Sequence, residues 1–371
     1  MIPSMQIELH SPALLCAHGS NWQQIWATFS QLAKPAPAPW PATGRAALDF
    51  AWSAPEPAIS QLGVDRKLAR TMEKQAKLAL AAASSSLAGG LHQAAQQIGL
   101  YLGLPTVDEA VPGWAALQDW HASGCDTSLS DVLLRGTPPF SGLTLLNSSV
   151  AAHISASNDL RGSMAIHSPH ADASLNALID GVLAVAEGEC PHALIGATSP
   201  KLDPLLPVQQ QVDDDESLLL PPGEAGVALM ASPGTSSGVH LAGYARGLLP
   251  VDNSSTALQT LVDRALAMAG LGSSAQVGWL LHNQPWTLPQ QQALADLTCP
   301  PLCLNIEQRF GRCGPAASLL ACGLALYGLG LRQGWHNDGE LPQSLAHNNA
   351  LIIALAPLGQ CVVVVLAGEQ P

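Results

Sequence analysis

The chain has 371 residues, of which 47% are hydrophobic and only 12% charged, and its net charge is −13. This length supplies a large core, and the apolar content excludes a disordered chain. Lys and Arg form no cluster in the sequence, which excludes a nucleic-acid partner, because such binding needs a basic surface. An average soluble domain has roughly 25% charged residues. The shortage therefore indicates a surface partly covered, by a membrane or by a durable protein interface.

The N-terminal residues 1–16 lack a basic stretch followed by an unbroken apolar run, so we expect no signal peptide and a cytoplasmic location. The eight cysteines form no CxxC pair, and the closest two, Cys299 and Cys303, lack a second pair at zinc-finger spacing. This usage is typical of reduced, mostly buried thiols. We expect no metal and no cofactor.

In chain order, the apolar spacing predicts helices over 66–88, 147–158 and 172–188, then strands over 192–198 and 225–232. A helix over 256–270, a strand over 276–282, a helix over 315–330 and strands over 349–356 and 360–368 follow. Buried strands that alternate with helices predict an α/β fold with a central sheet covered on both faces. Residues 34–44 and 208–224 read as loops, and the second is expected to join two halves, 1–220 and 221–371.

Residues 313–331 contain no charge and are long enough to cross much of a bilayer. The segment is rich in Gly and Ala and lacks interfacial aromatic residues. A helix fully buried in a large core has the same pattern. We therefore expect a buried helix and no membrane span.

The segment IHSPHADASLNALIDG (166–181) brings His167, His170 and Asp172 within six residues. A metal site is unfavourable here, because side chains three apart on a strand diverge and Pro169 keeps its preceding residue out of a helix. Strand, tight turn and helix N-terminus instead predict the geometry of a nucleophile elbow. A nucleophile would have to be Cys or Ser, yet the apex holds Ala171, and Ser168 comes one step early.

The sequence lacks GxGxxG after a strand, GxxxxGK[ST] and HExxH, and its GxSxG match at 234–238 (GTSSG) is not followed by a predicted helix. Nucleotide-binding, zinc-protease and α/β-hydrolase activities therefore have no motif support.

Six colinear blocks resemble the β-ketoacyl synthase family. They are 13–32 (ALLCAHGSNWQQIWATFSQL), 70–87 (RTMEKQAKLALAAASSSL), 145–198, 222–232 (PGEAGVALMAS), 279–289 (WLLHNQPWTLP) and 305–326 (NIEQRFGRCGPAASLLACGLAL). The resemblance implies the thiolase-like fold, with two similar halves whose central sheets are sandwiched by helices in five αβαβα layers.

The family's catalytic residues are nearly all replaced. By the resemblance, the nucleophilic cysteine falls on Ala171, the lysine on Glu307 and the second histidine on Arg312, while the first histidine is retained as His282. The Gly-rich turn near the C-terminus becomes APLG, residues 356–359. Condensation needs a thiolate to accept the acyl chain and donors to stabilise an enolate. We therefore expect no catalytic residue.

A subunit with this scaffold and no nucleophile resembles the chain length factor of type II polyketide synthases. The resemblance implies a heterodimer with an active ketosynthase, access to acyl carrier protein through that complex, and a role in shaping the elongation tunnel. Its Trp content and length resemble the aryl-polyene type of these systems. The residues that it suggests for tunnel or interface are Trp114, Leu117, Trp120 and His121 of the segment 114–125, with His167 and His170.

Two further hypotheses stay open. The chain could be an enzyme of its own, a decarboxylase or acyltransferase that uses His282 with Ser168 or Asp172. It could also be a homodimeric scaffold that binds carrier proteins without shaping a tunnel.

Overall fold

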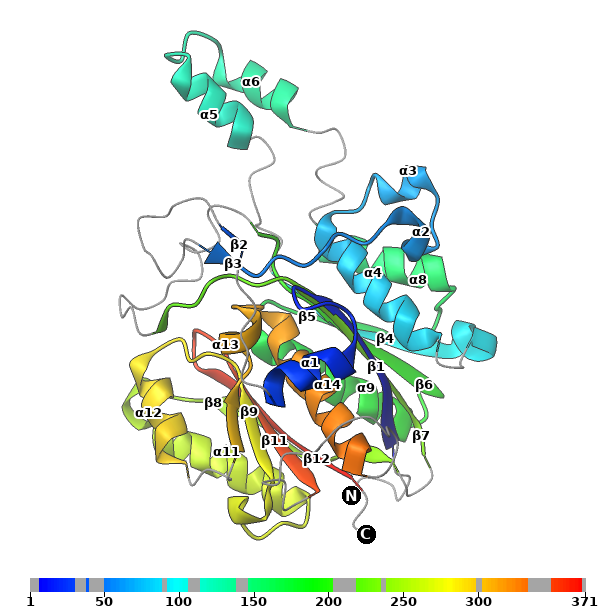
Figure 1. Cartoon of the computed structure of the whole chain (residues 1–371), viewed down its shortest axis with the longest axis vertical. Helices are drawn as coiled ribbons and strands as arrows, with labels where there is room; N and C mark the ends of the chain where they lie inside the picture. The colour runs from blue at the N-terminus through cyan, green and yellow to red at the C-terminus, as the bar shows by residue number, and fades with distance from the viewer. Residues whose placement is uncertain are drawn as a thin grey trace.

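The computed structural model describes residues 7–30, 38–39, 50–88, 92–105, 114–137, 146–202, 218–234, 238–297, 302–332 and 348–368. One mixed sheet has the strand order β10-β9-β11-β12-β8-β1-β7-β6-β4-β5, and helices cover it (Figure 1). Its strands are β1 (Ile7–Cys16), β4 (Ile98–Gly103), β5 (Met164–His167), β6 (His192–Thr198), β7 (Ala225–Pro233), β8 (Val239–Leu248), β9 (Trp279–His282), β10 (Leu302–Asn305), β11 (Asn349–Leu355) and β12 (Gln360–Ala367). A small separate ladder pairs β2 (Ala38–Pro39) with β3 (Phe50–Ala51).

The longer helices are α1 (Trp22–Ser30), α4 (Lys74–Leu87), α5 (Trp114–Ala122), α6 (Leu129–Gly136), α8 (Asn147–Asn158), α9 (Ala171–Ala186), α11 (Ser254–Met268), α12 (Leu288–Asp296) and α14 (Pro315–Arg332). Short helical turns are α2 (Ile59–Leu62), α3 (Arg66–Ala69), η2 (His92–Gln97), η4 (Val251–Asn253), η5 (Ser274–Gln276) and α13 (Glu307–Phe310).

The sheet consists of two copies of one strand arrangement. In the first copy β5, β4 and β6 run parallel. The strand β7 pairs antiparallel with β6, and β1 pairs antiparallel with β7. In the second copy β10, β9 and β11 run parallel. The strand β12 pairs antiparallel with β11, and β8 pairs antiparallel with β12. A short antiparallel contact between β1 and β8 joins them. The first copy thus contains β1 and β4 to β7, and the second contains β8 to β12. The boundary at 220/221 stays a prediction.

Three hydrophobic clusters show the layers. One lies between α4, α8 and the first half-sheet, one surrounds α9 and α14, and one lies between α11, α12 and the second half-sheet. The helices α9 and α14 pack on each other and contact strands of both half-sheets. The five αβαβα layers of the predicted thiolase-like fold are therefore confirmed, with α9 and α14 in the centre.

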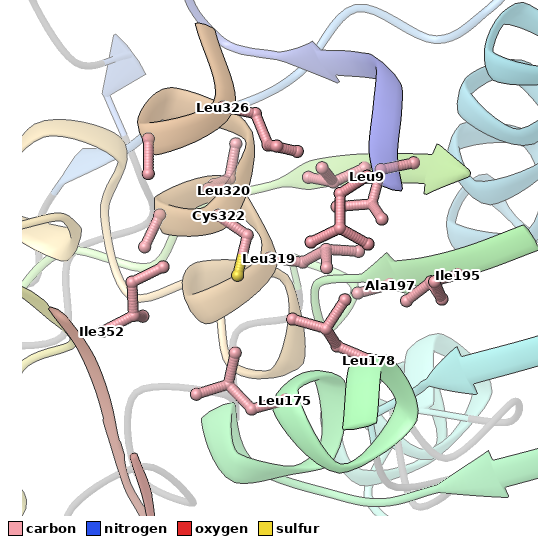
Figure 2. Packing of buried hydrophobic residues seen from close by; sticks show 14 of the residues in the cluster. Leu9, Leu175, Leu178, Ile195, Ala197, Leu319, Leu320, Cys322, Leu326 and Ile352 are labelled. Carbon is pink, nitrogen blue, oxygen red and sulfur yellow. The ribbon is translucent and has the colours of Figure 1, made fainter. Parts of the chain in front are cut away.

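The apolar segment 313–331 forms the central helix α14 and the residues just before it. Figure 2 shows Leu319 and Cys322 of α14 on the side toward Leu178 of α9, in one hydrophobic cluster. At Gly328, an added Cβ would lie 2.1 Å from the Trp279 ring, so only glycine permits this close approach. The segment is thus a core helix, and no helix among the described residues has the length and apolar character of a membrane span.

Two predicted elements differ from those observed. The helix expected over 66–88 is interrupted, since α3 ends at Ala69 and α4 starts at Lys74; between them the Thr71 hydroxyl donates to the Leu68 carbonyl at 2.7 Å. The strand expected from 276 begins at Trp279, because the preceding residues form η5. Of the two expected loops, 34–37, 40–44 and 208–217 lie outside the described residues.

Candidate functional site

The strand–turn–helix predicted around residue 170 is present. The strand β5 at the edge of the sheet ends at His167, Ser168 and Pro169 form the turn, and His170 is the N-cap of α9. Ala171 is the first helical residue and is 1% exposed. The position expected for a nucleophile thus carries a buried methyl group, which has no atom able to attack a thioester.

Three aromatic and charged side chains gather beside this turn. The His170 ring lies 5.4 Å from the Trp286 ring, edge to face, and the Arg312 guanidinium lies 4.1 Å from the Trp286 centroid. Cation–π attraction favours that second contact. Burial, and then the positive charge of Arg312, lower the pKa of His170 to about 4. His170 is therefore neutral at physiological pH.

Arg312 is a buried cation, only 4% exposed. Its Nη2 donates to the carbonyl oxygen of Leu218 at 2.9 Å and to that of Pro285 at 3.5 Å, while its Nη1 is buried without a hydrogen-bond partner. Burial lowers the pKa of Arg312, and the charge of Glu307 opposes this shift. Arg312 lacks a titratable imidazole, so it cannot exchange a proton with a substrate near neutral pH.

Glu307 connects two segments at the site by hydrogen bonds, the one after β9 and the one before α14. Its carboxylate accepts from the backbone N–H of Gln284 at 2.9 Å and of Cys313 at 2.8 Å. Burial raises the pKa of Glu307, and the Arg312 charge and the backbone N–H groups oppose this. A carboxylate held in this way ties the segment after β9 to the start of α14, a structural role.

His282, the last residue of β9, is positioned by its neighbours. Its Nδ1–H donates to the Asn283 carbonyl at 2.8 Å, which leaves Nε2 unprotonated in the neutral ring. Burial lowers the pKa of His282. The Asn283 amide exchanges hydrogen bonds with the backbone of Leu355, donating at 2.9 Å and accepting at 2.7 Å. Strand ends β9 and β11 therefore hold His282 in one orientation.

The stand-alone enzyme hypothesis needs Ser168 or Asp172 beside His282. The Ser168 hydroxyl donates instead to the Pro105 carbonyl at 3.2 Å. Asp172 has one buried carboxylate oxygen without a hydrogen-bond partner, and burial raises its pKa. Among the hydrogen bonds of the described residues, none joins either side chain to His282.

His167 lies on the other side of the turn. Its Nε2 is 2.9 Å from Oδ2 of Asp180, a carboxylate that also contacts Arg246 of β8. His167 therefore belongs to a half-exposed polar group that links β5, α9 and β8, separate from the Trp286 cluster.

The helices α5 and α6 form a hairpin that projects from the body (Figure 1). They pack on each other, and the Trp120 indole donates to the Thr127 carbonyl at 2.8 Å. Leu117 and Trp120 are half-buried and His121 is exposed, while the Trp114 side chain lies outside the described residues. These four candidates therefore lie on the projecting hairpin, away from His167 and His170 at the turn before α9.

Sequence reasoning missed Trp286, which touches both His170 and Arg312. The tryptophan lies within the family-like block 279–289, four residues after His282, where that block departs from the family's pattern. A tryptophan four residues after the retained His282, in a block that departs from the family's pattern, was the available signal.

The buried thiols offer no substitute nucleophile, and the two exposed ones, Cys125 and Cys303, lie outside the turn before α9. The cysteines of the described residues are free, and Cys16, Cys190, Cys313, Cys322 and Cys361 are buried. Burial raises the pKa of Cys16 to about 12 and that of Cys313 well above its usual range. In the same part of the chain, no group of three His, Cys, Asp or Glu side chains could hold a metal ion. Cys299 lies outside it.

No protein-family model matches the sequence, and no curated protein matches it. Solved structures do match. A β-ketoacyl synthase from Burkholderia phymatum aligns over 99% of this chain and 100% of its own, with 15% identity and a TM-score of 0.73. The chain has the ketosynthase fold.

Two further ketosynthase-fold matches are complexes. A ketosynthase in complex with its chain length factor from Xenorhabdus doucetiae aligns over 98% of both chains, with 15% identity and a TM-score of 0.72. The ishigamide ketosynthase/chain length factor aligns over 98% of this chain and 100% of its own, with 16% identity and a TM-score of 0.71. At these identities the shared property is the ketosynthase fold.

Proposed function

We propose that this chain is a non-catalytic ketosynthase-like subunit, a chain length factor, that pairs with an active ketosynthase and shapes its elongation tunnel. Ala171 carries the proposal, because the elbow retains strand, turn and helix while its apex lacks a nucleophile. Glu307 and Arg312 stand where the resemblance puts a lysine and a histidine. Acyl carrier protein would be reached through the complex.

The exposed edge strand β5 of the first half-sheet supports the proposal that a partner binds there. Strand β5 pairs only with β4 among the described strands, and Met164 on it is 50% exposed. An edge strand with an exposed large apolar side chain is a template for pairing with another chain. The nearby solved complexes contain a ketosynthase together with a chain length factor, and the low charge content agrees with a covered surface.

Co-expression with a ketosynthase encoded in the same gene cluster tests the proposal. We expect a 1:1 complex by size-exclusion chromatography with light scattering, and a lower yield of soluble protein when this chain is produced alone. Met164→Arg should abolish the complex, because it puts a charge on the β5 edge. Leu248→Arg is the matched control, since Leu248 is 64% exposed on β8 and should tolerate the charge. A stable homodimer that ignores the synthase would contradict the proposal and favour the scaffold hypothesis.

Restoring the thiol should not restore the chemistry. We expect Ala171→Cys to remain unacylated by acyl thioesters, because a side chain that is 1% exposed keeps its thiol protonated and shielded. Mass spectrometry of the intact chain, with the partner synthase as positive control, measures the loading. Rapid acylation of the variant would mean that the nucleophile alone is missing. Acylation of the natural chain would support the stand-alone enzyme.

The hairpin offers a test of tunnel shaping. If α5 lines the growing chain, Leu117→Ala enlarges the available space and the reconstituted complex should release longer products. Gln118→Ala is the control, since Gln118 is exposed on the same helix. Liquid chromatography with mass spectrometry gives the product lengths. Products of identical length from both variants would show that α5 does not line the tunnel.

A further inference from the structure

The second helix of the projecting hairpin, α6, buries none of its side chains. Leu134 on it is 79% exposed and Leu129 is 40% exposed, while Val132 and Leu133 are half-buried. The core helix α9, by contrast, buries most of its residues. Single exposed leucines are common on protein surfaces, but here two lie on one helix of eight residues. The chain therefore leaves large apolar side chains of α6 uncovered.

The contacts within the hairpin are close but few. A Cβ added to Gly136 of α6 would lie 2.3 Å from the methyl carbon of Ala116 in α5, so the two helices meet through small residues. The N-cap of α6, Ser128, makes no side-chain hydrogen bond to the helix. At the tip, Cys125 has a φ of 64°, a left-handed conformation that is unfavourable for a residue with a side chain. Little in the hairpin itself therefore holds it folded.

The helices are also short. The helix α5 has nine residues and α6 has eight. Helices shorter than about 12 residues are only marginally stable in water on their own, and in proteins their stability comes mainly from packing of an apolar face. A segment with few buried apolar contacts opens locally at little cost in free energy. The hairpin therefore needs a further surface to keep both helices formed.

Charge and position favour a different chain as that surface. The hairpin carries Asp119, Asp126 and Asp131 against a single Arg135, and the whole chain has a net charge of −13. A second copy would bring the same negative charge, and like charges repel. In chain order the hairpin lies between β4 and β5, the two outermost strands of the first half-sheet. The chain thus reaches the hairpin from the edge at which the partner is proposed to bind.

We propose that the hairpin is a docking arm, whose helices become stable only when Leu129 and Leu134 are buried against the partner ketosynthase. The identity of this occupant rests on the proposed function. Because the arm orders as it binds, part of the interaction free energy offsets the loss of conformational freedom. The complex would therefore form in two linked events, pairing at the β5 edge and folding of the arm.

Hydrogen exchange of the full chain, alone and in complex with the ketosynthase, tests the ordering. In the chain alone, amides of residues 117–122 and 132–137 should exchange within about tenfold of their intrinsic rates, whereas amides of α9 should stay protected. In the complex, the hairpin amides should slow by at least about tenfold, since their hydrogen bonds are then buried. Strong protection of the hairpin in the chain alone would overturn the proposal without reference to any partner.

The variant Leu134→Asp tests the contact. It should raise the dissociation constant of the complex about tenfold or more, measured by isothermal titration calorimetry. The melting temperature of the chain alone should stay unchanged, because the side chain is 79% exposed. Val251→Asp is the matched control, since Val251 on η4 is 72% exposed and this variant should bind as the natural chain does.

The outcomes separate the docking arm from the proposed function. Equal dissociation constants for the natural chain and both variants would overturn the arm and leave the proposed function standing. Failure of the natural chain to bind the synthase would contradict the proposed function and, with it, the occupant of the arm. Light scattering of the chain alone identifies the remaining case, because a homodimer that Leu134→Asp dissociates would show that a second copy covers α6, which also overturns the proposal.

Discussion

Replacing Glu307 by glutamine should lower the free energy of unfolding by about 2–3 kcal/mol, because a buried charged acceptor of two backbone hydrogen bonds is lost. Glu307 is 2% exposed and accepts two backbone N–H groups, from Gln284 and Cys313. A glutamine offers one acceptor oxygen and turns its NH₂ group toward the other donor. The same change removes the negative charge that opposes the lowering of the Arg312 pKa.

A double-mutant cycle separates these effects. Arg312→Met retains an apolar side chain on the Trp286 ring and removes the charge, so the double variant Glu307→Gln/Arg312→Met should be more stable than the sum of the single losses predicts. Urea unfolding at pH 7.5 supplies all four free energies. A loss below about 1 kcal/mol for Glu307→Gln, with no coupling to Arg312, would mean that Glu307 is already protonated in the folded chain.

Acid should destabilise the chain between about pH 6.5 and pH 4, and His170 should account for a large share. Its folded pKa of about 4 lies below the unfolded value of 6.5, so in this window the unfolded chain binds more protons. The stability is therefore complete above pH 6.5 and is lost as the pH falls toward 4. Because the ring is half-buried, we expect about 2 kcal/mol after allowance for solvent screening.

His170→Asn isolates that share, since asparagine keeps a polar side chain and does not titrate. Burial also lowers the pKa of His18, His153 and His282, which act in the same direction, whereas the raised pKa values of Asp172 and Glu307 oppose it. The difference between the two unfolding profiles is therefore the informative quantity. Parallel profiles from pH 7.5 to pH 4 would show that His170 is not held neutral by Arg312 and burial.

The sequence predicted the fold wherever burial decides the pattern. Strands β6, β11 and β12 and the helices α9 and α14 are apolar because helices or strands cover them, and their predicted bounds lie within about two residues of those observed. The strands β4 and β8 were not predicted, since Gly99, Gly103 and Gly243 break their apolar runs. At Gly103 the backbone of Ser174 comes so close that an added Cβ would lie 2.6 Å from it.

The sequence predicted which positions form the candidate site, but not the contacts between their side chains. The elbow and Ala171 follow from local order in the chain, as a strand, a proline turn and a helix start. The contact between His170, Trp286 and Arg312 depends on three segments that only the packed sheet brings together. Side-chain partners such as Glu307 with the backbone of Gln284 and Cys313 have no periodic signal in the sequence.

The duplicated strand order has a consequence for how such a protein changes over evolutionary time. In each half the chain runs from the outermost parallel strand into a central helix, β5 into α9 and β10 through α13 into α14, so the starts of these two helices lie where the two halves meet. The two halves are held together by apolar side chains of α9 and α14, while polar side chains such as His170 and Arg312 lie just before these helices. Side chains at these two helix starts can therefore be replaced without loosening the packing of α9 on α14, and the fold tolerates changes there.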